Sequence, residues 1–159
     1  MTSERYLGIY LNDHLAGAIA GHELAKRAAG NNEGTPTGTF LTRLADEIEA
    51  DRNTLERIMD QLEIKKDLLK DAAAWLAEKV GRLKLNGKLV GYSDLSRLVE
   101  LEGLSLGVEG KIALWRSLRQ VADRYPTLSD VNLEELQRRA ESQREELERF
   151  RLEAAQTAL

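Results

Sequence analysis

Apolar residues recur every three or four positions through most of this chain, a spacing that gathers them on one face of an α-helix. The pattern covers four segments, about 3–29, 38–63, 93–122 and 130–156. Its members are Leu7, Leu11, Leu15, Ala18, His22 and Ala25; Leu41, Leu44, Ile48, Asp51, Leu55, Ile58 and Leu62; Leu98, Leu101, Ser105, Val108, Ile112 and Trp115; and Leu133, Leu136, Ala140, Gln143, Leu147, Phe150 and Ala154. Each segment therefore presents one apolar stripe, which is typical of helices that pack in a bundle.

Breaks in the pattern separate the four segments. Residues about 28–39 are rich in Gly, Asn, Thr and Pro, so we expect a loop there. Ser93 or Asp94 can cap the third helix, because the side chain of either residue accepts a hydrogen bond from the first turn. After a proline-containing turn, Ser129 or Asp130 is the expected start of the last helix.

A fifth amphipathic segment, about 64–86, lies between the second and third helices, and much of its polar surface is basic. A connection of this length is needed if those two helices run parallel. We therefore predict an all-α fold in a single domain, residues 1–159. The expected architecture is a four-helix up-down bundle with a crossover helix between helices two and three and a frayed C-terminus. The basic face could contact an anionic membrane or an acidic partner, although a solvated crossover helix explains the same pattern.

Composition excludes several function classes. The chain has 159 residues, a net charge of −4, no cysteine and two histidines. Without cysteine there is no thiol nucleophile, disulfide framework or Cys-type zinc site. An acidic chain without aromatic-studded basic clusters is a poor nucleic-acid binder. No apolar run approaches the roughly 20 residues that span a bilayer, and no signal peptide is evident, so we expect a cytoplasmic protein.

Four polar residues interrupt the apolar stripes: His22, Asp51, Ser105 and Gln143. The last three lie near the middle of their helices, so antiparallel packing would place them in one layer inside the bundle. A buried polar layer is costly unless its members satisfy one another's hydrogen bonds. The layer could bind a metal or another ligand, it could fix the helix register, or its residues could lie at the edge of the seam. Spacing alone favours a structural role.

Four stretches of the chain resemble the helices of ferritin-like proteins, including bacterioferritins and small stress-associated members. They are YLNDHLAGAIAGHELAKRAA, EIEADRNTLERIMDQL, VEGKIALWRSL and RAESQREELERF. The resemblance implies a ferritin-like bundle in which glutamates and two Glu-x-x-His pairs hold two iron ions. In the third of these stretches, Glu109 stands at the position of the family's glutamate.

The ligands that the resemblance implies are incomplete in this chain. Ala18 stands where the family has its first glutamate. In the register set by Glu49 and Glu141, the histidine positions are taken by Arg52 and Arg144. A guanidinium has no lone pair to give to a metal. If these pairs point inward, their salt bridges could fill the cavity; if they point outward, they are ordinary surface pairs.

The apolar stripes set a different register. In that register the paired positions hold Ile48 and Asp51 on the second helix, and Ala140 and Gln143 on the last. Either way, two histidines and four carboxylates are not available in the required pattern. The resemblance therefore implies a bundle without a functional di-iron site.

A residual metal site is an alternative. His22 and Asp51, with Glu109 or Glu102, could hold one ion, since carboxylate and imidazole suit iron, manganese or zinc. His14 and His22 are eight residues apart on one side of the first helix and could also form a paired site. A histidine at the edge of a bundle, with access to water, is the plainer explanation.

Glycine is concentrated in the middle of the first and third helices. Residues 15–21 contain Gly or Ala at five of seven positions, and Gly103, Gly107 and Gly110 follow on the third helix. A glycine inside a helix costs about 1 kcal/mol relative to alanine, a cost that close helix approach usually offsets. The two glycine-rich stretches could face each other, a ligand or another subunit.

Nothing in the sequence identifies a nucleophile, an acid/base pair or a cofactor loop. We therefore predict a non-enzymatic ferritin-like bundle with no catalytic residues, no metal and no cofactor, acting through oligomer or partner contacts, and stress-associated as the resemblance implies. We expect a homodimer in which the basic segment 64–86 of one subunit complements the acidic N-terminal helices of the other. Nucleic acid and membrane are not expected partners. Two alternatives are a metal-binding oxidase or storage protein with a non-standard site, and a helical module that binds a different protein.

Overall fold

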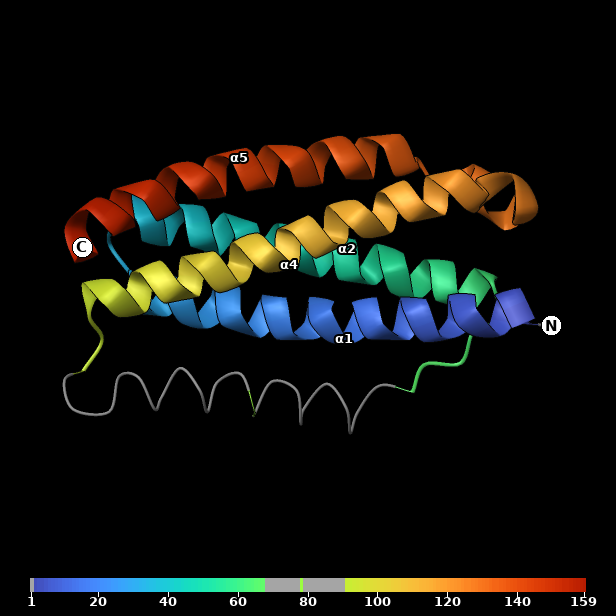
Figure 1. The fold of residues 1–159 in the computed structure, drawn as a ribbon, viewed down its shortest axis with the longest axis horizontal. Coiled ribbons are helices and arrows are strands. Elements are labelled where there is room, and N and C mark those ends of the chain that lie inside the picture. The colour runs from blue at the N-terminus through green and yellow to red at the C-terminus, as the bar shows by residue number, and fades with distance from the viewer. Residues whose placement is uncertain (1, 68–77, 79–90) are drawn as a thin grey trace.

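The computed structural model describes residues 2–67, 78 and 91–159, and within these residues the regular structure is entirely helical (Figure 1). The long helices are α1 (Thr2–Asn31), α2 (Pro36–Gln61), α4 (Asp94–Val121) and α5 (Leu133–Ala158). Two short 3₁₀ helices, η1 (Ala122–Arg124) and η2 (Pro126–Asp130), connect α4 to α5. The all-α prediction and its four long helices are confirmed.

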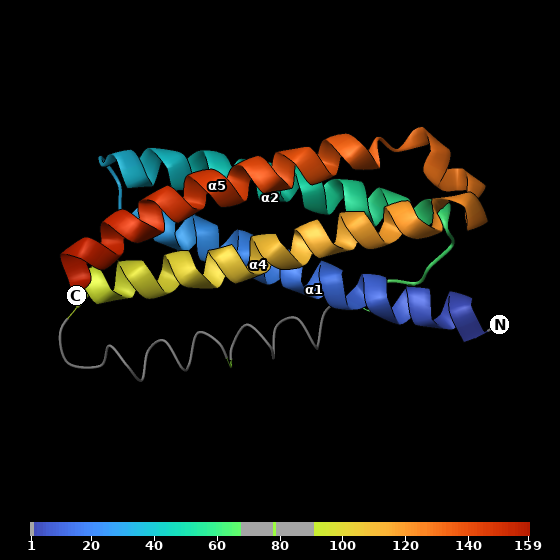
Figure 2. The same ribbon diagram turned by 45° about the horizontal axis from the view of Figure 1, so that its top comes forward.

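The helices form two antiparallel pairs, α1 with α2 and α4 with α5 (Figures 1 and 2). Packing is closest within these pairs. Between the pairs, α1 and α4 approach each other over fewer positions, and α2 and α5 over fewest. Helices α2 and α4 run in the same direction, so the end of α2 and the start of α4 lie at opposite ends of the bundle (Figure 1). Most of the predicted crossover helix, about 64–86, lies outside the described residues.

The first connection is shorter than the predicted loop over 28–39. Helix α1 continues through Asn31, and only residues 32–35 separate it from α2. Thr35 caps α2 by accepting a hydrogen bond at 3.0 Å from the N–H three residues later, and Pro36 occupies the first helical turn, where its missing N–H is not needed. Gly34 adopts a φ of 78°, which glycine allows without strain. A compact turn and a strong cap thus replace most of the expected loop.

The predicted cap of the third helix is confirmed. The Ser93 hydroxyl accepts a hydrogen bond from the backbone N–H of Ser96 at 3.2 Å, and the Ser93 N–H donates to the Ser96 hydroxyl. The last helix starts later than predicted. Residues Ser129 and Asp130 belong to η2, and Asn132 caps α5 instead, accepting a hydrogen bond in the first turn.

The predicted apolar stripes form the core. The fully or nearly fully buried members include Leu11, Leu15, Leu41, Leu44, Leu55, Ile58, Leu101, Val108, Ile112, Trp115, Leu147 and Phe150. The rings of Phe40 and Phe150 stack at 4.6 Å between α2 and α5. Helix α5 continues to Ala158, whose side chain packs against the core. None of the described helices combines the length and the apolar character needed to cross a bilayer.

Candidate functional site

A polar layer lies where α2, α4 and α5 meet. Asp51 of α2 is only 3% exposed. The Lys111 ammonium donates to the Asp51 carboxylate at 2.7 Å and to the Gln143 side-chain oxygen at 2.5 Å. Arg139 donates to the other Asp51 oxygen, and the Gln143 amide donates to Glu47 at 2.7 Å. These five residues form one connected network, here called the Asp51 network.

The network contains two of the four polar residues that interrupt the stripes. Asp51 and Gln143 are brought into one layer, joined through Lys111. Ser105 is half-buried, and its hydroxyl has no hydrogen-bond partner in the described part of the chain. His22 is buried on α1, and its Nδ1 atom likewise lacks a partner there.

Three members of the network were not predicted: Glu47, Lys111 and Arg139. Each directly precedes an inward-facing residue of a stripe. A long side chain at such a position can bury its stem and turn its polar end into the seam. A long polar residue immediately before a stripe member is thus a candidate for such a network, but Arg43, Arg57 and Arg149 share this position, so the pattern does not single out the three members.

The structure also decides which register faces the core. Glu49 is exposed, whereas Asp51 and Gln143 are buried, so the register of the apolar stripes points inward. The Glu-x-x-Arg positions instead form ion pairs at the surface, partly between α4 and α5. These pairs are Arg52–Glu49 at 3.6 Å, Arg144–Glu109 at 3.0 Å and Arg116–Glu141 at 2.8 Å.

The residues of the alternative metal site are not gathered around Asp51. Within residues 2–67, 78 and 91–159, no three histidine, aspartate or glutamate side chains lie close enough to hold a metal ion. Glu102 and Glu109 lie at the surface of α4, in ion pairs with arginines of α5. Both carboxylate oxygens of Asp51 are engaged, one by Lys111 and one by Arg139.

Burial and charge act in opposite directions on Lys111. Burial lowers the pKa of the Lys111 ammonium, and the adjacent Asp51 carboxylate opposes that shift. The side chain of Lys111 is 13% exposed, so the ammonium depends on its protein partners for hydrogen bonds. The charge pairing explains how a lysine can occupy the interior of a bundle.

A cavity of about 880 Å³ lies between α1 and α4 and reaches α2 at its floor. We call it the α1–α4 cavity. Its lining includes the glycine-rich stretches of both helices, with Gly17, Gly21, Gly103, Gly107 and Gly110. Among the residues that the structure describes, a Cβ atom at four of these five glycines would meet no atom within 4 Å, and at Gly103 it would approach the Leu24 side chain at 3.2 Å. The glycines therefore border the cavity and are not explained by close contact between the helices.

The two histidines are placed differently. His14 lines the α1–α4 cavity, whereas His22 is not among its lining residues. The rings of His14 and Tyr10 meet edge to face at 4.5 Å. Burial lowers the pKa of His14, and the neighbouring Asp13 carboxylate partly opposes this shift.

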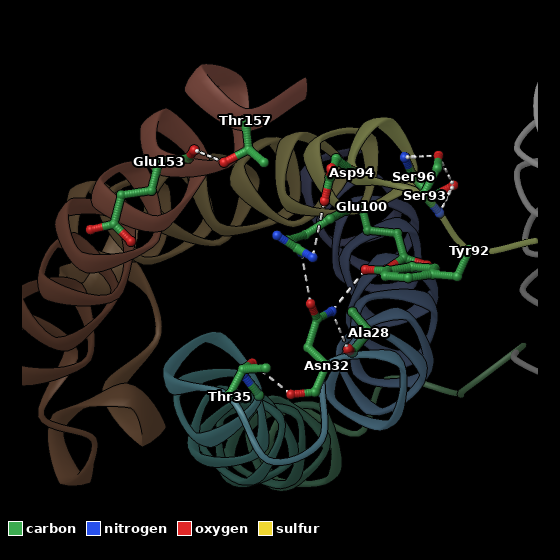
Figure 3. A network of polar contacts seen from close by, with 12 residues as sticks. Ala28, Asn32, Thr35, Tyr92, Ser93, Asp94, Ser96, Glu100, Glu153 and Thr157 are labelled. Atoms are coloured by element: carbon green, nitrogen blue, oxygen red, sulfur yellow. Dashed lines mark hydrogen bonds and ion pairs between the residues drawn. The ribbon is translucent and has the colours of Figure 1, made fainter. Parts of the chain in front are cut away.

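A second polar cluster joins the end of α1 to the start of α4 (Figure 3). The Asn32 amide donates to the Tyr92 hydroxyl at 2.7 Å, and that hydroxyl donates to Glu100 at 3.1 Å. Arg97 donates to the Asn32 side-chain oxygen at 2.8 Å, and Arg27 lies 3.5 Å from Glu100. The cluster therefore connects the C-terminal end of α1 to the first residues of α4 and to Tyr92 just before them.

Burial dominates the electrostatics of this cluster. It raises the pKa of Tyr92 to about 12, against the hydrogen bond from Asn32. It also raises the pKa of Glu100, although the Tyr92 hydrogen bond and the Arg27 charge favour the carboxylate. The sequence carries no signal for this cluster, because its members are far apart in the sequence and meet only where α1 and α4 pack together.

Known proteins do not identify this chain. No protein-family model matches it, and the searches of curated proteins and of solved structures found no match. The resemblance to ferritin-like helices therefore stays a prediction. Functional proposals rest on the chain's own residues, chiefly the Asp51 network and the α1–α4 cavity.

Proposed function

We propose that this protein is a non-enzymatic helical bundle, ferritin-like in arrangement, that acts by binding and not by metal chemistry. The observation that carries the proposal is the engagement of both Asp51 oxygens by cationic side chains. The parallel course of α2 and α4, which requires a long connection, agrees with the ferritin-like part of the proposal.

The Lys111 ammonium occupies the kind of position that a metal ion would need. It lies between a carboxylate oxygen and an amide oxygen inside the bundle. A metal ion at Asp51 would have to displace this ammonium or tolerate its charge. Two like unit charges 4 Å apart repel by about 4 kcal/mol at the effective dielectric constant of a protein surface, and a divalent ion doubles that figure. The network is therefore a poor host for a divalent cation.

Metal analysis tests the proposal. The full chain is purified, treated with a chelator, incubated with iron(II) or manganese(II), desalted and measured by inductively coupled plasma mass spectrometry. We expect far less than one equivalent of either metal. Near-stoichiometric iron or manganese would contradict the proposal and favour the oxidase or storage alternative.

A charge reversal supplies the positive control. Lys111→Glu removes the ammonium and adds a carboxylate beside Asp51 and the nearby Glu47. Because three carboxylates would then meet in one layer, we expect this variant to take up manganese. Circular dichroism establishes that the variant is folded before its metal content is compared with that of the wild type.

Contacts with another chain form part of the same proposal. Several large apolar side chains of α1 and α4 are exposed: Tyr6, Ile9, Leu95 and Leu106. Leu106 is 76% exposed and lines the mouth of the α1–α4 cavity. Light scattering over a range of concentrations tests the expected homodimer. A monomer at all concentrations would exclude it.

A further inference from the structure

The α1–α4 cavity has the size and shape of a site for an elongated small molecule. Its volume of about 880 Å³ lies within the range of roughly 300–1,000 Å³ that is usual for ligand pockets. Along α1 its lining extends from Asp13 to Arg27, about 20 Å at the helical rise of 1.5 Å per residue. The cavity is thus elongated along the seam between the two helices.

The middle of the cavity suits an alkyl chain. Gly17 and Gly21 face it from α1, Gly103 and Gly107 from α4, and the floor includes Leu55. These glycines weaken their helices, and no close contact between the described helices explains Gly17, Gly21 or Gly107. Larger side chains at these positions would fill the space that a slender apolar ligand needs.

One end of the cavity carries hydrogen-bond donors with unmet capacity. Trp115 is 1% exposed and lines the cavity, and its indole Nε1–H has no acceptor in the described part of the chain. Arg52, at the same end, pairs with the exposed Glu49 through its terminal Nη2 group at 3.6 Å, but its buried Nε–H lacks an acceptor in the same described residues. Lys111 also lines this end, and Asp51 and Gln143 engage two of the three donors of its ammonium. Leaving a buried donor unpaired is unfavourable, so an anionic oxygen is the natural complement to this end.

The opposite end is less suited to an anion. Glu23 and Glu102 line it, together with Arg27, which is engaged with Glu100. At the donor-rich end, Asp51 is already paired with cationic side chains, while Asp13 is exposed. The two ends of the cavity therefore differ in charge and in free donors, and the end at Arg52 and Trp115 is the one suited to an anion.

We propose that the α1–α4 cavity binds a long-chain fatty acid. The alkyl chain lies along the glycine-rich stretches, and the carboxylate lies at the end formed by Arg52, Trp115 and Lys111. This inference goes beyond the proposed function and rests on it only in that the bundle binds its ligand without transforming it.

The test uses palmitate as the probe and the delipidated full chain as the protein. Isothermal titration calorimetry is expected to show about one palmitate bound per chain, with heat that becomes more favourable as temperature rises, as burial of apolar surface requires. Hexadecyltrimethylammonium carries the same chain on a cation. It is expected to bind at least about tenfold more weakly, because the donors at Arg52 and Trp115 attract an anion.

Two pairs of variants test the assignment of tail and head. Gly107→Leu fills the middle of the cavity and is expected to weaken palmitate binding by at least about tenfold, while its better helix propensity favours folding. Gly30→Leu, on α1 outside this cavity, is the control and should stay within about twofold. Arg52→Met is expected to weaken palmitate binding about tenfold, whereas Arg57→Met, on the exposed face of the same helix, should not.

Several results would overturn the proposal. They are the absence of palmitate binding to the wild type, equal binding of the anionic and cationic probes, and equal effects of Gly107→Leu and Gly30→Leu. A dimer that Gly107→Leu dissociates would assign the cavity to a second copy of the chain and would also overturn it. Palmitate binding by a protein that retains stoichiometric metal would refute the proposed function alone. A metal-free protein that ignores palmitate would refute the fatty-acid site alone.

Discussion

Two seams of this bundle are less closely packed than the helix pairs, and they differ in what lines them. Between α2 and α5, long polar side chains meet at Asp51 and form a connected network. Between α1 and α4, glycines leave a cavity of about 880 Å³. Helix α4 borders both features, with Lys111 lining the cavity and joining the network. The contrast shows that a bundle can separate its helices either by filling a seam with paired charges or by lining it with glycines that leave it open.

The largest effect is expected from removing the centre of the network. Asp51→Leu leaves the buried Lys111 ammonium without its carboxylate, so we expect a loss of about 3–5 kcal/mol in the free energy of unfolding. Urea unfolding followed by circular dichroism measures it. In the double variant Asp51→Leu/Lys111→Met, most of the loss should be recovered, since neither charge remains buried and Arg139 is 39% exposed and can turn to solvent. If the double variant loses as much free energy of unfolding as the two single variants together, charge pairing does not stabilise this seam.

Glycine-to-alanine substitutions should change stability in opposite directions at the open α1–α4 seam and in the closely packed first turn of α2. Gly107→Ala adds a methyl group where no atom of residues 2–67, 78 or 91–159 lies within 4 Å, so it should raise the free energy of unfolding by about 0.5–1 kcal/mol. At Gly38 a Cβ atom would lie 2.0 Å from the Asn32 carbonyl oxygen, so Gly38→Ala should destabilise the protein by more than about 1 kcal/mol. Thermal and urea unfolding of both variants measure whether the free energy of unfolding rises or falls. Destabilisation by Gly107→Ala would mean that α1 and α4 need this glycine for contact.

The cluster at the end of the bundle predicts an effect that depends on pH. Burial raises the pKa of Glu100 in the folded protein above its ordinary value of 4.5, so the folded state binds this proton more tightly than the unfolded state. The stability that Glu100 contributes is therefore fully present below pH 4.5 and is lost as pH rises through the raised pKa. Glu100→Gln removes this titration. The unfolding free energy of the wild type, minus that of the variant, should fall between pH 4.5 and neutrality. A difference that rises with pH would contradict the burial of this carboxyl.

The smallest effect is expected at the surface pairs between α4 and α5. Arg144 and Glu109 lie 3.0 Å apart, but both side chains are largely solvated. Glu109→Ala should leave the urea midpoint unchanged within experimental error, because solvent and salt screen such pairs. Comparison with Asp51→Leu under identical conditions separates a network residue from a surface residue of the same charge. A shift as large as that of Asp51→Leu would place Glu109 in the network.

The fold could be predicted to the extent that periodicity determines it. The 3.6-residue repeat identifies the inward face of each helix, so Asp51 and Gln143 could be recognised as polar members of the core. Helix ends were less predictable. Gly30 and Asn31 have low helix propensity, yet α1 continues through them, because propensity is a weak constraint beside tertiary packing.

The candidate sites depend on geometry that periodicity does not supply. Lys111 and Arg139 lie one position from the stripe, and their long stems decide whether they reach Asp51. The glycine stretches indicate an unusual seam, but only the separation of α1 and α4 decides between close contact and a cavity. Asn32 and Glu100 are linked through the Tyr92 hydroxyl. No local sequence pattern reveals this link between distant segments.

A paramagnetic titration tests most directly whether the Asp51 network excludes metal. Amide ¹H–¹⁵N spectra of the full chain are recorded with increasing manganese(II), whose unpaired electrons broaden the signals of nearby residues. In the wild type we expect the signals of Asp51, Lys111 and Gln143 to keep their intensity. In the Lys111→Glu variant we expect the signals at the same three positions to broaden. Selective loss of these three signals in the wild type would contradict the proposal, because it would place a divalent cation where the Lys111 ammonium lies.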